Sequence, residues 1–304
     1  MVAQDGNSWR IGFDIAFAYG LQGGHDETEG LSPDGEVIEV EDHAHDVEMD
    51  LTRFEFSMSR TFNDTWDSVL RVPYLIKDQT AETVFPDPIS DDDREAAIRS
   101  GYSHHRTETY EGFADLELSV GWRTRGLWLD GSIFRFSLGT TIPVGDTEDD
   151  PLTAGDAGLE HLHVQFGNGT FDPLLDFYFG VPLNEKLAVS AFGRARIPLY
   201  ENSKGYRGSP EITFAPRATW LPHKRLSVHA GLNASYYGYA EWYDRRDPNT
   251  GQFNLDASLG LGFKVTDTIT SSFTALLPLY SRSFSDEDVL EPAPTFSIST
   301  GWAF

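Results

Sequence analysis

Strict alternation of side-chain types most constrains how this chain can fold, and it is clearest near its two ends. In residues 295–304, one alternate set is Phe296, Ile298, Thr300, Trp302 and Phe304, and the other is Ser297, Ser299, Gly301 and Ala303. Residues 9–21 alternate in the same way, with Trp, Ile, Phe, Tyr and Leu on one face. Because successive side chains of a strand point to opposite faces, both segments are predicted as strands with one apolar face.

Ten further segments show the same period, so about twelve strands are predicted. They cover residues 9–21, 47–62, 66–77, 114–123, 128–144, 161–180, 187–200, 210–221, 225–242, 253–265, 269–280 and 295–304. The apolar parity changes between Leu51 and Phe54, which predicts a bulge near Thr52 and Arg53. One helix is predicted, at 90–99, capped by Ser90 and closed by Gly101.

The connections between these strands alternate in length. Those at 63–65, 124–127, 181–186, 222–224 and 266–268 are short, and the others are longer. Short turns on one rim and long loops on the other are typical of an up-and-down antiparallel transmembrane β-barrel. We therefore predict an all-β barrel of about twelve strands. We expect one domain, residues 1–304, with both termini periplasmic and long outer loops at 22–46, 78–111 and 145–160.

The tryptophans support a membrane barrel over a soluble β-sandwich. Six of the seven fall at short-turn ends of the predicted strands and on the outward parity: Trp9, Trp66, Trp122, Trp128, Trp220 and Trp302. Tryptophan gathers at membrane–water interfaces, whereas in a soluble sandwich it would scatter through the core. We predict that these six form an interfacial girdle.

Composition excludes several classes of protein. No apolar run approaches the ~20 residues of a spanning helix, and the mean hydropathy is −0.36, which also suits strands that are apolar on one face only. The formal charge of −25 argues against nucleic acid as a partner. With no Cys, disulfides and thiolate metal sites are excluded. Residues 1–8 show no secretory signal peptide, so we expect either a cytoplasmic protein or, as the barrel pattern favours, a mature sequence behind a cloning Met.

Charged side chains of the inward parity are the candidate lining of a solute path. They are the basic residues Arg71, Arg123, Arg135, Arg194, Arg196 and Arg217 and the acidic residues Asp14, Asp115, Glu117, Glu211 and Asp256. One interpretation is a charged track that orients a polar or anionic solute. The other, which we favour, is a salt-bridged lumen that keeps a narrow barrel rigid, because buried charges must be paired in any case.

Metal binding and catalysis have weaker support. His161 and His163 share one strand face, and His25, His43, His45, His104 and His105 lie in the predicted loops. Histidines near carboxylates bind Zn²⁺ or Cu²⁺, but two ligands do not make a site and the loops cannot be placed from sequence. No G-x-S-x-G motif is present, and Ser103–His104 has no evident orienting partner. We therefore expect that the protein is not an enzyme and that it binds no cofactor.

Three segments carry a family resemblance. Residues 112–123 (GFADLELSVGWR), 137–145 (SLGTTIPVG) and 161–176 (HLHVQFGNGTFDPLLD) resemble outer-membrane barrels described as transporters of a phenol meta-cleavage pathway, distant relatives of fatty-acid and aromatic-hydrocarbon transporters. The terminal Phe304, with Trp302 two residues earlier, is similar to the C-terminal signal strand of bacterial outer-membrane proteins. The resemblance covers about 65 residues well and carries over no catalytic residue.

The resemblance implies a location in a bacterial outer membrane and passive uptake of a small solute, with apolar and aromatic molecules as candidates. The alternative is a non-transporting structural barrel, or an anchor or receptor that uses its acidic outer loops. The expected partners are outer-membrane lipid and lipopolysaccharide, the barrel-assembly machinery through the strand that ends at Phe304, and the solute itself.

Overall fold

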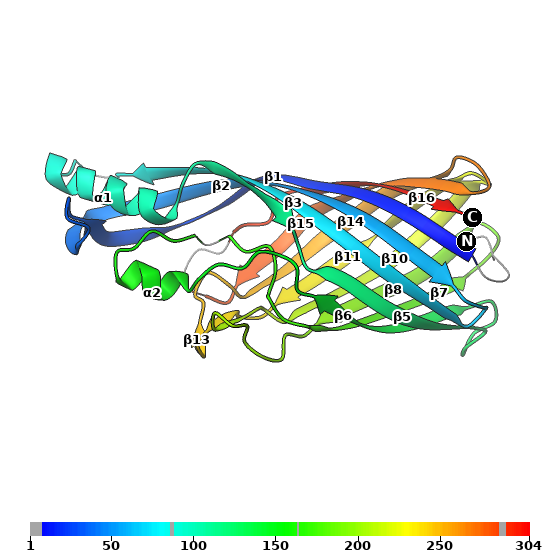
Figure 1. The fold of residues 1–304 in the computed structure, drawn as a ribbon. Coiled ribbons are helices and arrows are strands. Elements are labelled where there is room, and N and C mark those ends of the chain that lie inside the picture. Colours follow the sequence, from blue (N-terminus) through cyan, green and yellow to red (C-terminus); the bar gives the residue numbers. More distant parts are fainter. Residues whose placement is uncertain (1–7, 86–87, 163, 286–289) are drawn as a thin grey trace.

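The computed structural model describes residues 8–85, 88–162, 164–285 and 290–304. Its main antiparallel sheet closes on itself, because β1 (Ser8–Leu31) pairs with β16 (Thr295–Ala303). Its other strands are β2 (Val37–Thr61), β3 (Trp66–Val84), β4 (Glu108–Phe113), β5 (Leu116–Arg125), β6 (Ile133–Ile142), β7 (Pro173–Pro182), β8 (Leu187–Arg196), β10 (Glu211–His223), β11 (Leu226–Tyr237), β14 (Gln252–Lys264) and β15 (Ile269–Ser283). Since β4 and β5 pair with β3 one after the other, the thirteen strands fill twelve positions (Figure 1). The predicted twelve-stranded up-and-down barrel is confirmed.

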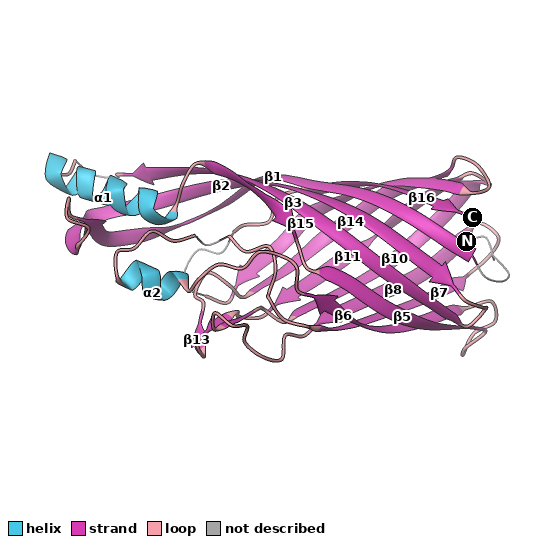
Figure 2. Cartoon of the chain, in the orientation of Figure 1, coloured by secondary structure: helices cyan, strands magenta, loops and turns pink. Residues whose placement is uncertain are grey.

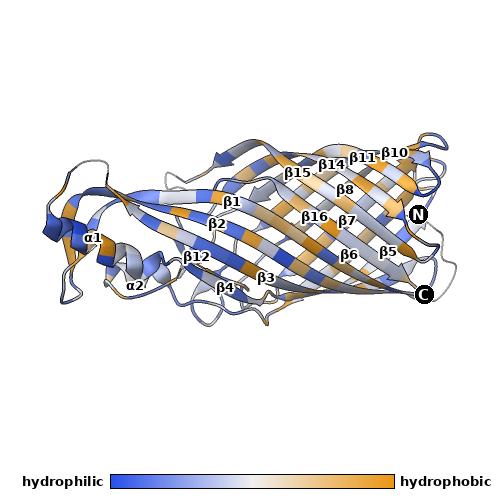
Figure 3. Cartoon of the chain, turned by 90° about the horizontal axis from the view of Figure 1, so that it is seen from above, coloured by the Kyte–Doolittle hydropathy of each residue, from blue (hydrophilic) through white to orange (hydrophobic). Residues whose placement is uncertain are grey.

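The strand register places the apolar set of side chains on the outside of the barrel. Phe13 on β1 lies opposite Phe56 on β2, and Ile15 lies opposite Ile298 on β16. Phe13, Phe56 and Ile298 are 47%, 41% and 49% exposed. Figure 3 shows such hydrophobic residues alternating with hydrophilic ones along the barrel strands. An exposed apolar belt of this kind is what a barrel presents to lipid. Neither described helix is long and apolar enough to cross a membrane.

Both ends of the described chain lie at one end of the barrel, and the helices lie at the other (Figure 1). The short connections are at the end that holds the termini, as the alternation of loop lengths predicts. Trp66 and Trp122 face each other across β3 and β5 at this end, and Trp302 lies opposite Ile11. Trp128 lies in the turn before β6, at a positive φ of 67°, and not inside a strand as predicted. Trp242 instead is buried against Tyr206 in a small sheet at the helix end.

The largest departure from the predicted fold is residues 22–46, which are strand and not loop. β1 and β2 run on as a two-stranded hairpin that projects past the barrel wall and turns at residues 32–36 (Figure 2). A hairpin that does not contact lipid needs no row of apolar side chains on one face. The acidic residues 22–46 therefore show no apolar alternation, and the sequence did not predict a strand there.

The predicted bulge near Thr52 and Arg53 is wrong. β2 pairs with β3 without interruption from Ala44 to Thr61, and the register shift lies in β1, between Ala18 and Leu21. Gly20 supplies the positive φ of 72° there, a conformation that glycine adopts at no steric cost. Leu51 breaks the apolar parity of β2 because it points into the barrel, next to Lys77 on β3.

Helix α1 (Asp91–His104) packs along the projecting hairpin (Figure 1). Ser90 caps it as predicted, accepting a hydrogen bond from the backbone N–H of Asp93. The helix does not close at Gly101 and continues to His104. A Cβ at Gly101 would lie 2.6 Å from Cε1 of His45, so this glycine serves close packing between helix and hairpin and is not a C-cap.

The segment before β7 folds into the mouth of the barrel. The predicted strands 128–144 and 161–180 shorten to Ile133–Ile142 and Pro173–Pro182. The chain between them forms α2 (Pro151–Asp156) and then an irregular stretch. Asp172 in that stretch is fully buried and accepts hydrogen bonds from Asn168 and Thr170. The small sheet of β9 (Tyr206–Arg207), β12 (Glu241–Trp242) and β13 (Arg245–Arg246) lies at the same end.

Candidate functional site: the lumen and its outer mouth

An ion-pair network crosses the lumen, and three of its members are predicted lining residues. Glu117 on β5 joins Arg71 on β3, with Nη1 of Arg71 3.0 Å from Oε2, and Arg194 on β8, with Nη2 of Arg194 2.6 Å from Oε1. β6 and β7 separate β5 from β8 in the sheet, so the second pair reaches across the lumen and not along the wall. Glu55 and Arg53 on β2 extend the network, through contacts of 3.6 Å to Arg71 and 2.6 Å to each other.

Other predicted lining residues form separate pairs. Arg135 on β6 forms a bidentate ion pair with Asp67 on β3, with Nη2 2.6 Å from Oδ1 and Nε 3.1 Å from Oδ2. Arg196 pairs with Glu211, which is its neighbour across β8 and β10. Asp14 accepts a hydrogen bond from the hydroxyl of Ser299 across the seam that closes the barrel. These residues line the lumen as pairs, which suits the favoured interpretation of a rigid, salt-bridged interior.

The remaining predicted residues lie elsewhere in the lumen or at its ends. Arg123 holds the turn at the terminal end, donating to the carbonyl oxygens of Asp64 (2.8 Å) and Asn63 (3.0 Å). Asp115 is buried and anchors the mouth segment, accepting from the backbone N–H of Gly145 and Asn168. Arg217 lies opposite Gly231, and Asp256 accepts from Asn233 at 3.2 Å.

Sequence reasoning missed four lumen residues of this set: Arg53, Glu55, Asp67 and Asp176. Asp67 follows the outward Trp66, so the parity of β3 already placed it inside. Because a bulge was predicted near Thr52 and Arg53, the sequence did not show which side chains of this part of β2 face the lumen. Arg53 and Glu55 were therefore not predicted as lumen residues. Asp176, 3.9 Å from Nε of Arg194 and hydrogen-bonded to Ser137, lay in a predicted strand whose parity was uncertain.

A cavity of about 610 Å³ lies near the terminal end of the barrel, beside the ion-pair network. Small residues such as Gly12, Ser57 and Gly262 line it together with charged ones, among them Arg10, Asp14 and the network member Glu55. Small residues therefore leave space next to the long ion-paired side chains. The barrel interior is partly filled and not solid.

A largely apolar chamber of about 160 Å³ lies inside the mouth of the barrel at the helix end. Its apolar walls come from β2, from the irregular stretch after α2 and from the segment before β16: Val47, Met49, Leu162, Val164 and Leu290. Its polar groups are Gln79, Asn249 and three histidines, His25, His104 and His105, and Gly23 and Gly24 complete the lining. Val47 and Val164 are buried. An apolar pocket with a few polar groups is the usual form of a small-ligand site.

Histidines gather at the edge of this chamber and three of them line it, although they do not form the pair of neighbours on one strand face that the sequence predicts. His161 stacks on His104, with ring centroids 5.5 Å apart, and His163 lies outside the described residues. His25, His43, His45 and His105 join His104 from the hairpin and the end of α1. Burial alone would raise the pKa of the nearby Glu27. Contact with His45, together with His104 and His25, outweighs burial and lowers the pKa of Glu27 below its ordinary value.

A closed antiparallel barrel with an apolar outer belt and a polar, partly open lumen defines the class of outer-membrane β-barrels. The fold is similar to that of an outer membrane channel from Pseudomonas putida F1, with a TM-score of 0.60 and 12% identity over 100% of this chain and 97% of that one. This likeness confirms the resemblance to outer-membrane transporter barrels at the level of the fold. No family model matches the sequence, and no curated protein matches it.

Two further solved barrels align with TM-scores below 0.5. The NanC porin aligns with a TM-score of 0.45 and 9% identity, over 94% of this chain and 99% of that one. A Pseudomonas aeruginosa FadL homologue aligns with a TM-score of 0.42 and 11% identity, over 98% and 90%.

Proposed function

We propose that this protein is a channel of a bacterial outer membrane that takes up a small apolar or aromatic solute passively. The observation that carries the proposal is the apolar chamber inside the mouth of an otherwise acidic outer end. A cavity of about 150 Å³ is large enough to hold benzene, and the chamber measures about 160 Å³ with five apolar side chains in its lining. The chamber therefore matches a solute the size of one aromatic ring.

A thinly paired seam in the barrel wall supports a route out of the chamber that avoids the charged network. β1 pairs with β16 as far as Ala18, opposite Thr295, and among the described residues a single bridge, Gln22 to Glu291, continues the seam, although β1 itself runs to Leu31. Past that point a cavity of about 580 Å³ lies between β1 and β15, lined among others by Gly23 and Tyr280. Gly23 borders both spaces, and Leu290 lies against it. We propose that the solute passes Leu290 and leaves sideways into lipid.

Filling the chamber tests the proposal. In Met49→Trp the indole occupies the space between Val47 and Val164, and we expect uptake of radiolabelled benzene by porin-deficient cells to fall to the level of cells without the protein. Met58→Trp is the matched control, because Met58 lies on the same strand but faces outward, opposite Ile11. Uptake by this control is expected to equal that of the wild type.

Two results would count against a channel. The first is equal uptake by cells with and without the inserted wild-type barrel. The second is an unchanged rate in Met49→Trp. The first result would favour a non-transporting anchor or receptor that uses the acidic hairpin.

A further inference from the structure

The inner face of the projecting hairpin carries four potential metal ligands. His25 and Glu27 on β1 lie opposite His45 and His43 on β2, and the four positions alternate, so their side chains share one face. His43 and His45 are each only 1% exposed. Three imidazoles and a carboxylate therefore meet on a hairpin that the barrel itself does not need.

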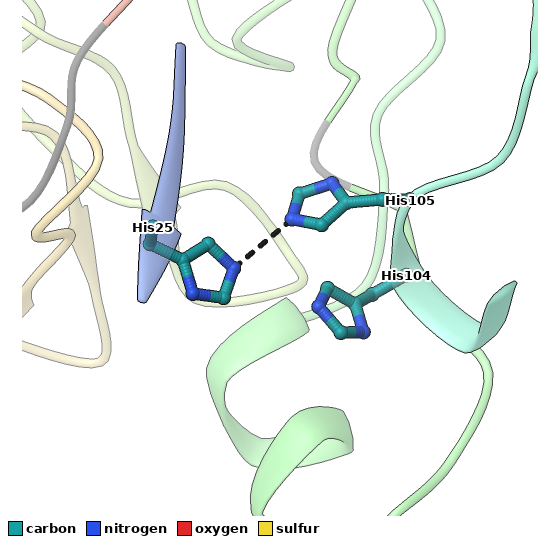
Figure 4. A group of neighbouring side chains, drawn as sticks. All are labelled: His25, His104 and His105. Atoms are coloured by element: carbon teal, nitrogen blue, oxygen red, sulfur yellow. Dashed lines mark hydrogen bonds between the residues drawn. The ribbon is translucent and has the colours of Figure 1, made fainter. Parts of the chain in front are cut away.

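The end of α1 brings two more ligands to this face. His104 and His105 are adjacent, with ring centroids 4.3 Å apart, and His104 is buried. Nε2 of His25 lies 3.1 Å from Nε2 of His105, and both rings point into one space with His104 beside them (Figure 4). Gly101 makes this approach possible, because a side chain there would collide with His45.

The donor atoms converge in two groups, His25 with His104 and His105, and Glu27 with His43 and His45. Within each group one ligand atom per residue lies within 4.8 Å of the others. Two nitrogens bound tetrahedrally at about 2.0–2.1 Å from Zn²⁺ lie about 3.3 Å apart. The Nε2–Nε2 distances are 3.1 Å for His25 with His105 and 3.1 Å for His43 with His45.

In the group of Glu27, His43 and His45, one histidine makes a hydrogen bond through the ring nitrogen that would not bind the metal. Such a bond is usual for a metal-binding histidine. Nδ1 of His43 lies 3.0 Å from the carbonyl oxygen of Glu41. A carbonyl oxygen only accepts, so Nδ1 donates and Nε2 is the nitrogen turned toward the other ligands. Nε2 of His43 faces Nε2 of His45, which is 2.9 Å from Oε2 of Glu27. The three potential ligand atoms therefore converge on one small space that a cation can occupy.

The cluster has an entry path. A cavity of about 330 Å³ between α1, α2 and the hairpin is lined by His25, Glu27 and His104. His25 and His104 also line the apolar chamber. The first group therefore stands between the outer cavity and the chamber.

We propose that these six side chains form a transition-metal site of the Zn²⁺ class, with one ion held by His25, His104 and His105 and a second by Glu27, His43 and His45. Imidazole nitrogens suit Zn²⁺, Cu²⁺ and Ni²⁺, whereas Ca²⁺ and Mg²⁺ take oxygen ligands. A bound ion ties the end of α1 to β1 above the chamber. The site does not depend on the proposed transport.

The experiment uses the whole protein in detergent, stripped of metal with a chelator and then titrated with Zn²⁺. We expect two ions per wild-type chain and one in His25→Ala/His105→Ala. The matched control His223→Ala/His229→Ala, with both histidines outside the cluster, should keep two. Co²⁺ in place of Zn²⁺ should give the intense visible absorption of a tetrahedral nitrogen-ligated ion in the wild type.

Hydrogen exchange supplies an independent readout of the site. In the wild type, Zn²⁺ should slow exchange of the amides of α1, and in His25→Ala/His105→Ala it should not. The proposal is overturned if the folded double variant binds as much Zn²⁺ as the wild type, or if Co²⁺ shows only the weak spectrum of an octahedral, water-ligated ion.

Discussion

Replacing Glu117 by Ala should widen the lumen and make its net charge more positive. Glu117 is the carboxylate that Arg71 and Arg194 share, so its loss leaves Arg71 with only Glu55 at 3.6 Å and Arg194 with only Asp176 at 3.9 Å as described counter-charges. In planar bilayers we expect single-channel conductance to rise and the reversal potential in a KCl gradient to move toward anion preference. Arg194→Ala should move the reversal potential the opposite way.

The same substitution should also destabilise the barrel. Removing one partner of a buried ion pair costs about 3–5 kcal/mol, and we expect the lower end because water reaches this lumen. Urea unfolding in lipid vesicles measures the cost. Glu185→Ala, an equal change of charge in an exposed turn, is the control and should alter neither quantity. If conductance, selectivity and stability of Glu117→Ala all equal those of the wild type, the network has no part in the lumen.

The second large effect tests which face of the barrel meets lipid. Ile298 and Ser297 are neighbours on β16, and the register places Ile298 outside and Ser297 inside. An Arg on the lipid face near the bilayer midplane costs about 2–4 kcal/mol, whereas lumen positions tolerate it. Ile298→Arg should therefore lower the free energy of unfolding in vesicles by about that amount, and Ser297→Arg should change it little. Equal costs, or a larger cost at Ser297, would reverse the assignment of the two faces.

Alternation predicted the membrane-facing part of this fold because lipid imposes it. Phe13, Trp66 and Ile298 must face outward, so their spacing reveals both the strand and its inner face, and Arg71, Glu117 and Arg194 follow as lumen residues. Beyond the membrane that constraint ends. The hairpin of β1 and β2 has no lipid-facing set, so residues 22–46 gave no strand signal.

The histidine cluster was beyond sequence reasoning for a different reason. His25, His45 and His104 come from three elements, and only the path of α1 along the hairpin brings them together. Gly101 is the one residue whose identity reflects the close contact between α1 and the hairpin. A glycine near a helix end, however, predicts a C-cap more often than a packing contact. The apolar chamber was hidden likewise, because Met49, Val164 and Leu290 come from three separate segments.

The most direct test of the central claim, that the chamber receives an aromatic solute, is a crystal structure of the protein soaked with bromobenzene. The anomalous signal of bromine locates the ring without ambiguity. We predict a bromine peak inside the chamber, beside Met49 and Val164, that is absent from crystals of Met49→Trp. Bromine only on the outer, lipid-facing surface, or a peak in the chamber region that the Trp variant keeps, would contradict the account.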